Sequence, residues 1–228
     1  MYKYVLIDLD NTILDFHLAE KKAHKKTSEE FNIFWSESLY EKYHVINDGW
    51  WKRLERGECT KQEVKVNRYV EYFSLLNVSV SPKDFSDRYL VNLSLGKDLI
   101  DGALETLKKL YDFGLKLYIA TNGVYEVQKN RLSNQEFMKY IEGVFVSEKL
   151  GYQKPQKEFF EMASKEAGID FTKDTIIVGD SLTSDMLGGV NYGIDTLWVN
   201  KDNLENHLNL NLTYVVNNIT EIVDILTK

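Results

Sequence analysis

The chain has 228 residues and a formal net charge of −7, with 43% hydrophobic and 28% charged residues. This ordinary globular balance excludes a disordered or fibrous chain, and the length allows one large domain or one domain that carries an insert. The negative charge disfavours binding to nucleic acid polymers and to anionic membranes, because no basic patch interrupts it.

The cysteine content and the first apolar run bear on the compartment. Cys59 is the only cysteine, so an intrachain disulfide is impossible and a reducing compartment fits. The run at residues 4–9 is short and contains Asp8, so it cannot serve as the apolar part of a signal peptide or span a bilayer. We therefore expect a cytoplasmic protein.

Short apolar, β-branched runs recur along the chain, and most are separated by helix-length amphipathic stretches. They lie at residues 4–9, 115–120, 143–147, 175–178 and 196–199. Such alternation predicts a parallel sheet in an α/β fold. Gly114, Gly168 and Gly193 stand where helices should pass into strands, and Pro155 stands where a helix should begin.

The stretch between the first run and the helix near residues 102–113 has helical periodicity and no convincing strand. We predict an inserted helical cap domain at residues 15–97, with residues 1–14 and 98–228 forming a Rossmann-like core domain. Most aromatic residues of the insert should pack as the core of a small bundle. They are Phe31, Phe34, Trp35, Tyr40, Tyr43, Trp50, Trp51, Tyr69, Tyr72, Phe73 and Tyr89.

The first predicted strand leads into a pair of acidic residues, Asp8 and Asp10. Ligands of a parallel α/β sheet gather at the carboxyl ends of its strands, so polar residues at these ends are candidates for a site. In extended geometry, residues two apart can lean toward one face, where one carboxylate can act as a nucleophile and the other as an acid. Asp8 also lies inside an apolar run, where an unpaired carboxylate is costly to bury, and this favours a partner such as a metal ion.

Other strand ends carry groups that can bind a phosphoryl group. Thr121, Asn122 and Gly123 follow the second run and offer a hydroxyl and backbone amides at the start of a helix. Lys154 follows the third run and offers a positive charge. We take these four residues as phosphate-binding candidates, and Thr121 and Lys154 also as catalytic candidates.

The fourth run ends at Asp180, and Asp185 follows five residues later. A carboxylate that attacks a phosphate dianion meets repulsion on the order of 4 kcal/mol, so a cation must lie between them. Asp8 and Asp180 could supply the ligands, and hard oxygen donors favour Mg²⁺ over Zn²⁺. Each motif alone is also typical of turns, helix caps and surface charges, so only the combination indicates a function.

Taken in this order, the segments resemble the motifs of the haloacid dehalogenase superfamily of phosphotransferases. The four motifs are residues 8–12, Thr121, Lys154, and Gly179-Asp180 with Asp185. The resemblance spans the whole chain. It implies a Rossmann-like core with a helical cap inserted after the first strand.

The resemblance also implies roles for the acidic residues. Asp8 would be the nucleophile that forms an aspartyl-phosphate, and Asp10 the acid that protonates the leaving oxygen and then the base that activates water. Mg²⁺ would be held by the Asp8 carboxylate, the Asp10 main-chain carbonyl and Asp180. Asp185 would be a direct or outer ligand, and the presence of Asp10 argues against the dehalogenase branch, which lacks an acid there.

A narrower resemblance is to the pyrimidine 5′-nucleotidase subfamily. Its segments are residues 10–16, Thr121-Asn122-Gly123 with Gln128 and Arg131-Leu132, and Ser147-Glu148 leading to residues 151–155. It implies removal of phosphate from nucleoside monophosphates such as UMP, dUMP and dTMP. The expected partner is therefore a small phosphomonoester, and we expect a monomer or weak homodimer.

Two alternatives stay open. The chain could be a phosphatase for sugar phosphates or other small phosphomonoesters, or a β-phosphoglucomutase-like mutase, although Asn122 and Gly123 disfavour the mutase. A receiver-like signalling protein that is phosphorylated on aspartate also combines acidic residues, a hydroxyl and a lysine around Mg²⁺. Receivers carry their phosphoacceptor later in the fold and lack a cap of about 80 residues.

Overall fold

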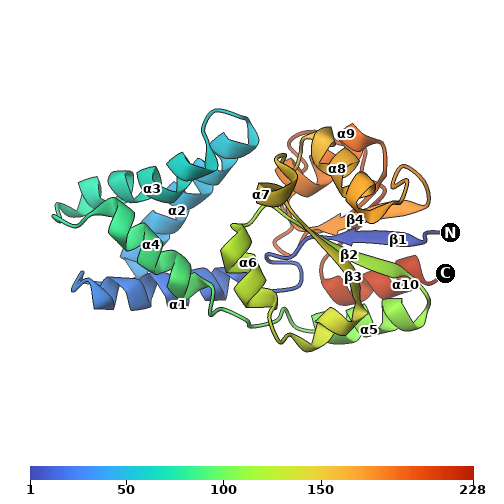
Figure 1. Cartoon of the computed structure of the whole chain (residues 1–228), viewed down its shortest axis with the longest axis horizontal. Helices are drawn as coiled ribbons and strands as arrows, with labels where there is room; N and C mark the ends of the chain where they lie inside the picture. Colours follow the sequence, from blue (N-terminus) through green and yellow to red (C-terminus); the bar gives the residue numbers. More distant parts are fainter. The chain divides into compact units, whose positions relative to one another are not determined.

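A computed structural model describes residues 1–228. The chain divides into two compact units, which we call the core unit, Met1–Asp15 with Lys97–Lys228, and the cap unit, Phe16–Gly96 (Figure 1). None of the helices combines the length and the apolar character needed to cross a lipid bilayer.

The core unit contains a parallel sheet of six strands in the order β3-β2-β1-β4-β5-β6. The strands are β1 (Tyr4–Ile7), β2 (Lys116–Thr121), β3 (Ile141–Val146), β4 (Thr175–Gly179), β5 (Asp195–Val199) and β6 (Tyr214–Val216). The five predicted runs are β1 to β5, so the predicted α/β class is confirmed, and β6 is additional. The chain turns from one side of β1 to the other between β3 and β4, and in such sheets ligands bind where the strand order reverses.

Residues of β1 alternate between two apolar cores, one on each face of the sheet. Val5 and Ile7 belong to the first core and Leu6 to the second, as the two-residue period of a strand requires. Helices α5 (Ala103–Asp112) and α10 (Ile222–Leu226) contribute to the first core, and α8 (Lys157–Ala167) to the second. Because both faces are covered, β1 is apolar throughout.

The remaining short elements of the core unit lie between these strands and helices. They are α6 (Tyr125–Leu132), α7 (Ser147–Leu150), α9 (Leu187–Tyr192), the 3₁₀ turns η1 (Glu136–Tyr140) and η3 (Ile219–Glu221), and the π-helical turn η2 (Leu182–Met186). The elements that follow β2, β3 and β4 start at the carboxyl edge of the sheet. They therefore carry their first residues into the region where a site is expected.

The predicted helix boundaries are confirmed at the glycines and wrong at the proline. Gly114, Gly168 and Gly193 have φ of 100°, 67° and 84°, a region that glycine enters without steric cost. Pro155 does not begin a helix, because α8 starts at Lys157 with Gln156 as its N-cap. Before a proline, the α conformation is disfavoured, and hydrogen bonds to Asn122 hold the backbone of Lys154 in a turn instead.

The cap unit consists of four helices. They are α1 (Phe16–Glu30), α2 (Glu37–Glu55), α3 (Lys61–Leu76) and α4 (Pro82–Leu93). Ser36, Thr60 and Ser81 cap the last three, each hydroxyl accepting a backbone N–H of the first turn. Thr60 and Glu63 satisfy two such groups reciprocally as a capping box, so these starts are encoded locally.

Aromatic side chains fill the interior of the cap unit. Tyr43 and Tyr69 stack with ring centroids 5.3 Å apart, and their hydroxyls share a 2.9 Å hydrogen bond. The predicted aromatic core is confirmed for the residues that are buried, whereas Phe34 is 77% exposed. The buried members are Tyr40, Tyr43, Tyr69, Tyr72, Phe73 and Tyr89, together with Phe85.

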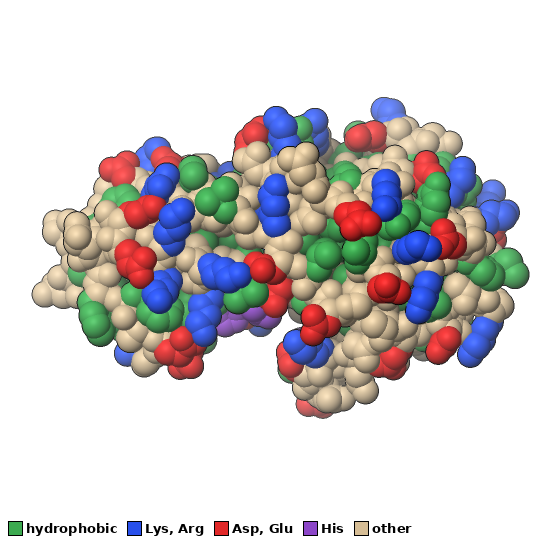
Figure 2. All heavy atoms as spheres, turned by 90° about the horizontal axis from the view of Figure 1, so that it is seen from below, with side chains coloured by type: hydrophobic (Ala, Val, Ile, Leu, Met, Phe, Trp, Pro, Cys, Tyr) green, Lys and Arg blue, Asp and Glu red, His purple; other side chains and the backbone are tan.

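The surface mixes charges of both signs. On the face shown in Figure 2, basic and acidic side chains are interspersed, with apolar atoms between them. Pairs one helical turn apart are common, such as Lys83 with Asp87 and Lys108 with Asp112, each at 2.6 Å. Exposed pairs of this kind contribute little to stability, so the fold depends on the buried residues.

Candidate active site

Three carboxylates meet at the carboxyl edge of the sheet. Asp8 follows β1, Asp180 follows β4 and Asp185 lies in η2, and one oxygen of each is within 4.8 Å of the others. The strands β1 and β4 are neighbours that pair Ile7 with Val178, and the amide of Asp8 donates to the Val178 carbonyl at 2.8 Å. The sheet register therefore brings together acids that are far apart in the sequence.

The buried ammonium of Lys154 lies among these acids. It donates to Asp8 at 2.7 Å, to Asp185 at 2.6 Å and to the carbonyl of Ala120 at 2.6 Å. An ammonium has three donors, so these contacts use all of them and fix its position. Only 1% of the lysine side chain is exposed, and two of its three partners are acidic.

Burial and mutual repulsion perturb the acids of this site. Burial raises the pKa of Asp8 to about 8; the charge of Lys154 opposes this rise and that of Asp185 adds to it. Burial, followed by the charges of Asp8 and Asp185, raises the pKa of Asp180 well above its usual range. Burial works against a charged Lys154, but the charges of Asp185 and Asp8 outweigh it and raise the lysine pKa. One ammonium thus faces three acidic groups, so acidic groups outnumber basic ones at this site.

The donor set fits a hard divalent cation. Carboxylate oxygens of Asp8, Asp180 and Asp185 lie close enough to share one ion, and a cation would relieve the repulsion between these acids. Oxygen ligands without nitrogen or sulfur favour Mg²⁺ over Zn²⁺.

Outer contacts hold Asp180 and Asp185 in place. The indole N–H of Trp198 donates to the Asp180 carbonyl at 2.8 Å, and the amide of Ser181 donates to the Asp185 carboxylate at 3.2 Å. A Cβ at position 179 would lie 2.2 Å from Oδ2 of Asp185. Gly179 therefore permits the close approach of this carboxylate to the strand end.

Asp10 has a different set of partners from Asp8. Arg131 forms an ion pair with Oδ1 of Asp10, and Nε2 of Gln128 donates to Oδ2 at 2.7 Å. Asn11 adopts a left-handed conformation with φ of 58°, which asparagine tolerates better than most residues. The two acids of the first motif are thus engaged separately, Asp8 with a lysine and Asp10 with an arginine and a glutamine.

Gln128 and Arg131 have no assigned role in the sequence analysis, where they only mark a resemblance. They lie three residues apart on α6, so they share a helix face, and Arg131 also donates to Oε1 of Gln128 at 3.1 Å. Both are buried, which for an arginine usually requires a partner. The available signal in the sequence was their position, since the helix that carries them follows the Thr121 turn directly.

The turn after β2 connects the phosphate-binding candidates. The Thr121 hydroxyl accepts from Nε2 of Gln128 at 3.0 Å and from the amide of Gly123 at 3.1 Å. The side chain of Asn122 donates to the carbonyl of Lys154 at 2.9 Å and accepts its amide at 3.0 Å. Asn122 therefore positions the loop that carries Lys154. A Cβ at position 123 would lie 2.0 Å from Nε2 of Gln128, so any side chain there would have to displace Gln128.

A separate hollow of about 650 Å³ lies at the opposite, amino-terminal edge of the sheet. Its lining includes Tyr2, Asp195 and Leu226. Because parallel sheets bind ligands at the carboxyl ends of their strands, the acidic edge and not this hollow is the candidate catalytic centre.

Comparisons with known proteins identify the family of the chain. Residues 5–199 match the haloacid dehalogenase-like hydrolase family. The chain is 35% identical over 227 residues to the pyrimidine 5′-nucleotidase PynA of Streptococcus pneumoniae, covering 100% of this chain and 96% of that protein. It is 24% identical to the pyrimidine 5′-nucleotidase YjjG of Escherichia coli, covering 100% of this chain and 99% of that protein. The magnesium-bound crystal structure of the HAD-hydrolase YfnB of Bacillus subtilis is similar at a TM-score of 0.94 and 34% identity, covering 100% and 99%. With its four motifs gathered at one sheet edge, the chain belongs to the haloacid dehalogenase-like hydrolases.

Proposed function

We propose that this hydrolase removes the phosphate of pyrimidine nucleoside 5′-monophosphates such as UMP, dUMP and dTMP, through an aspartyl-phosphate on Asp8. The observation that supports this most strongly is the meeting of Asp8, Lys154, Asp180 and Asp185 at one sheet edge. The chain also aligns along its full length with a pyrimidine 5′-nucleotidase. Phosphoryl transfer needs a nucleophile, a cation and donors for the phosphoryl oxygens, and the residues at this edge can supply each of them.

Asp8 is the proposed nucleophile. Lys154 binds one of its oxygens at 2.7 Å and so limits the rotation of the carboxylate. Asp8, Asp180 and Asp185 would hold Mg²⁺ with the carbonyl of Asp10, and the bound ion would neutralise charge on the phosphoryl oxygens. Attack of the Asp8 carboxylate on phosphorus then displaces the nucleoside oxygen, and water later cleaves the acyl phosphate.

Asp10 is the proposed acid and base. It must be protonated to donate to the leaving oxygen and ionised to accept a proton from water. Both of its oxygens are engaged, one by Arg131 and one by Gln128. Since catalytic hydrogen bonds often rearrange when substrate binds, we expect one of these contacts to loosen when Asp10 takes up its proton.

Thr121 is the proposed donor to a phosphoryl oxygen. A hydroxyl has one hydrogen to donate and two lone pairs that accept. Gln128 and the amide of Gly123 both donate to the Thr121 oxygen, so its own hydrogen remains to point toward an acceptor such as phosphate. Lys154 supplies the positive charge beside it, and Asn122 holds the lysine backbone.

A panel of phosphomonoesters tests the substrate. With Mg²⁺ present, we expect kcat/KM for UMP, dUMP and dTMP to exceed that for hexose and triose phosphates by at least about tenfold, a difference of about 1.4 kcal/mol in transition-state binding. Faster turnover of sugar phosphates would reject the nucleotidase assignment. Formation of an isomeric phosphate without release of inorganic phosphate would indicate the mutase. Chelation of Mg²⁺ should abolish turnover, and activity that survives chelation would reject the metal role.

A further inference from the structure

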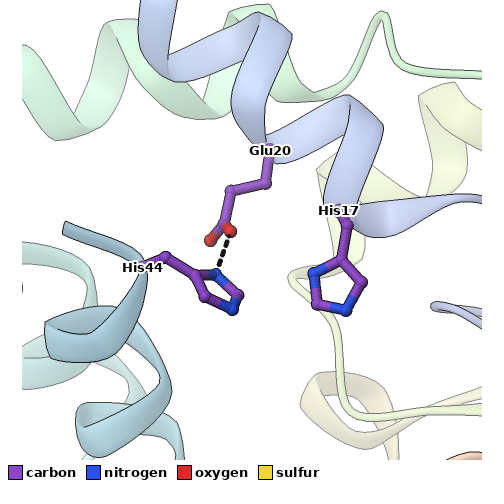
Figure 3. Close-up of side chains that lie close together, drawn as sticks. All are labelled: His17, Glu20 and His44. Carbon is purple, nitrogen blue, oxygen red and sulfur yellow. Dashed lines mark hydrogen bonds and ion pairs between the residues drawn. The ribbon is translucent and has the colours of Figure 1, made fainter. Parts of the chain in front are cut away.

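The cap unit contains a second group of residues with metal-binding chemistry. His17 and Glu20 lie three residues apart on α1 and share one helix face, and His44 comes from α2. One potential ligand atom from each lies within 4.8 Å of the other two. Figure 3 shows the three side chains directed into a common space between the two helices.

The carboxylate of Glu20 is fully buried and highly constrained. It accepts from Nδ1 of His44 at 2.6 Å, from the amide of Asn47 at 2.6 Å and from the hydroxyl of Tyr40 at 3.0 Å. A buried carboxylate is costly unless it is paired or bound to a cation, and Asn47 and Tyr40 are neutral. These neutral donors orient the carboxylate in the way that outer partners orient metal ligands.

Two imidazoles and one carboxylate form the donor set of a zinc site with an open fourth position. Nitrogen donors favour Zn²⁺ over Mg²⁺, in contrast to the all-oxygen set of the core unit. We propose that His17, Glu20 and His44 form a zinc-binding site in the cap unit, separate from the catalytic centre.

The geometry requires only small movements. Tetrahedral zinc with bonds of about 2.0 to 2.2 Å places its ligand atoms roughly 3.3 Å apart. Nδ1 of His44 and the Glu20 oxygen, now 2.6 Å apart, would separate by roughly 0.7 Å to admit the ion and lose the proton they share. His17 is exposed and His44 is partly exposed, so the ion has a path from solvent and His17 has room to adjust.

A bound ion would link α1 to α2. All three ligands belong to the cap unit, so zinc binding there does not depend on the acids of the core unit or on the proposed nucleotidase activity. Zinc should therefore stabilise the folded cap unit, by an amount that grows with the logarithm of the zinc concentration above its Kd.

Titration of the full chain with Zn²⁺ and with Co²⁺ as a spectroscopic probe tests the proposal. We use the Asp180→Asn variant as the parent, because it should weaken the core site and it changes no residue of the cap unit. We expect binding of one Co²⁺ per chain with the visible absorption of four-coordinate nitrogen-ligated cobalt, displaced by Zn²⁺. His17→Ala and His44→Ala should each weaken Zn²⁺ binding by at least about 100-fold, because even outer partners of a metal commonly contribute 10- to 100-fold.

His207→Ala is the matched control, since His207 is an exposed histidine of the core unit. It should bind Zn²⁺ like the parent. If His44→Ala unfolds, the exposed His17→Ala decides: its thermal unfolding without metal should match the parent, and its stabilisation by Zn²⁺ should be lost. Unchanged Zn²⁺ affinity in His17→Ala, or absence of binding in the Asp180→Asn parent, would overturn the proposal.

Discussion

The two units bury charge in opposite ways. In the core unit, Asp8, Asp180 and Asp185 surround one ammonium, so acidic groups outnumber basic ones. In the cap unit, the guanidinium of Arg68 lies 4.9 Å from the centroid of the Tyr69 ring and donates to Asn47 at 2.7 Å. The cap thus surrounds its buried cation with rings and an amide.

This difference separates structural from functional burial of charge. A charge that is satisfied inside its own unit specifies packing, whereas an imbalance marks a place where a ligand completes the structure. Glu20 is an intermediate case. Its carboxylate accepts hydrogen bonds from His44 and from neutral donors, and it also lies within 4.8 Å of a potential ligand atom of His17. The predictions below test whether the imbalance in the core unit is functional.

The largest expected effect is on turnover. Asp8→Asn removes the nucleophile, and we expect kcat to fall by a factor on the order of 10⁴ to 10⁶. The same change at Asp195, at the amino-terminal end of β5, should leave kcat unchanged. Steady-state phosphate release measures both. A decrease of less than tenfold in Asp8→Asn would show that another group attacks phosphorus.

Removing each buried cation sharpens the contrast. Lys154→Met leaves three acidic groups without their ammonium. Near pH 8, we expect the free energy of unfolding to fall by about 3–5 kcal/mol. We also expect kcat to fall by about 10²- to 10³-fold. Arg68→Met in the cap replaces a cation among tyrosines, so it should lower stability with little change of kcat per folded molecule. Urea unfolding and turnover decide, and equal loss of kcat in both variants would contradict the contrast.

The sequence predicts the sheet well because burial imposes a simple pattern. Strands covered on both faces are apolar runs, and all five that were predicted are present. The sixth strand, β6, has three residues and only Val216 is buried, so it carries no such run. The helix starts at Ser36 and Thr60 are also encoded locally, since each side chain caps its own first turn, although they were not predicted from the sequence.

The position of a candidate residue was predictable where it follows directly after a strand. Asp8, Thr121 and Asp180 were placed at one sheet edge because the carboxyl ends of parallel strands meet there. The contacts of Gln128 and Arg131 with Asp10 span 118 and 121 residues, and they depend on how α6 packs. The group of His17, Glu20 and His44 was not predicted for the same reason. The spacing of His17 and Glu20 can be read from the sequence, but the packing that brings His44 on α2 beside them cannot.

A smaller effect is expected from pH in the metal-free protein. The folded pKa of Asp8 is raised from 3.8 to about 8, so between these values the folded state holds a proton that the unfolded state lacks. The free energy of unfolding should then fall as pH rises through this window, by up to about 1.4 kcal/mol per pH unit. Mg²⁺ binds ionised carboxylates, so the increase in Tm on adding Mg²⁺ should be larger near pH 8 than near pH 5. Equal increases at both pH values, in calorimetry, would contradict this.

The smallest expected effect is in the cap unit and has the opposite sign. Burial, and then the charge of Arg68, lowers the pKa of His24 from 6.5 to about 3, and its ring stacks on Tyr43 at 4.2 Å. Below about pH 6.5, His24 binds a proton in the unfolded state but stays neutral in the folded state. The free energy of unfolding should therefore fall as pH drops through this window, by up to about 1.4 kcal/mol per pH unit. His44, whose pKa is raised by its hydrogen bond to Glu20, changes stability in the other sense.

The quantity to measure is therefore the difference between wild type and His24→Phe, which keeps a ring against Tyr43. Urea unfolding followed by tryptophan fluorescence suits this, because Trp35, Trp50 and Trp51 lie in the cap unit. From about pH 7 to about pH 5, the free energy of unfolding of the wild type should fall relative to that of the variant. If both proteins lose the same stability over that range, His24 is protonated in the folded state, and the cap unit buries a charge that the surrounding rings and Arg68 should exclude.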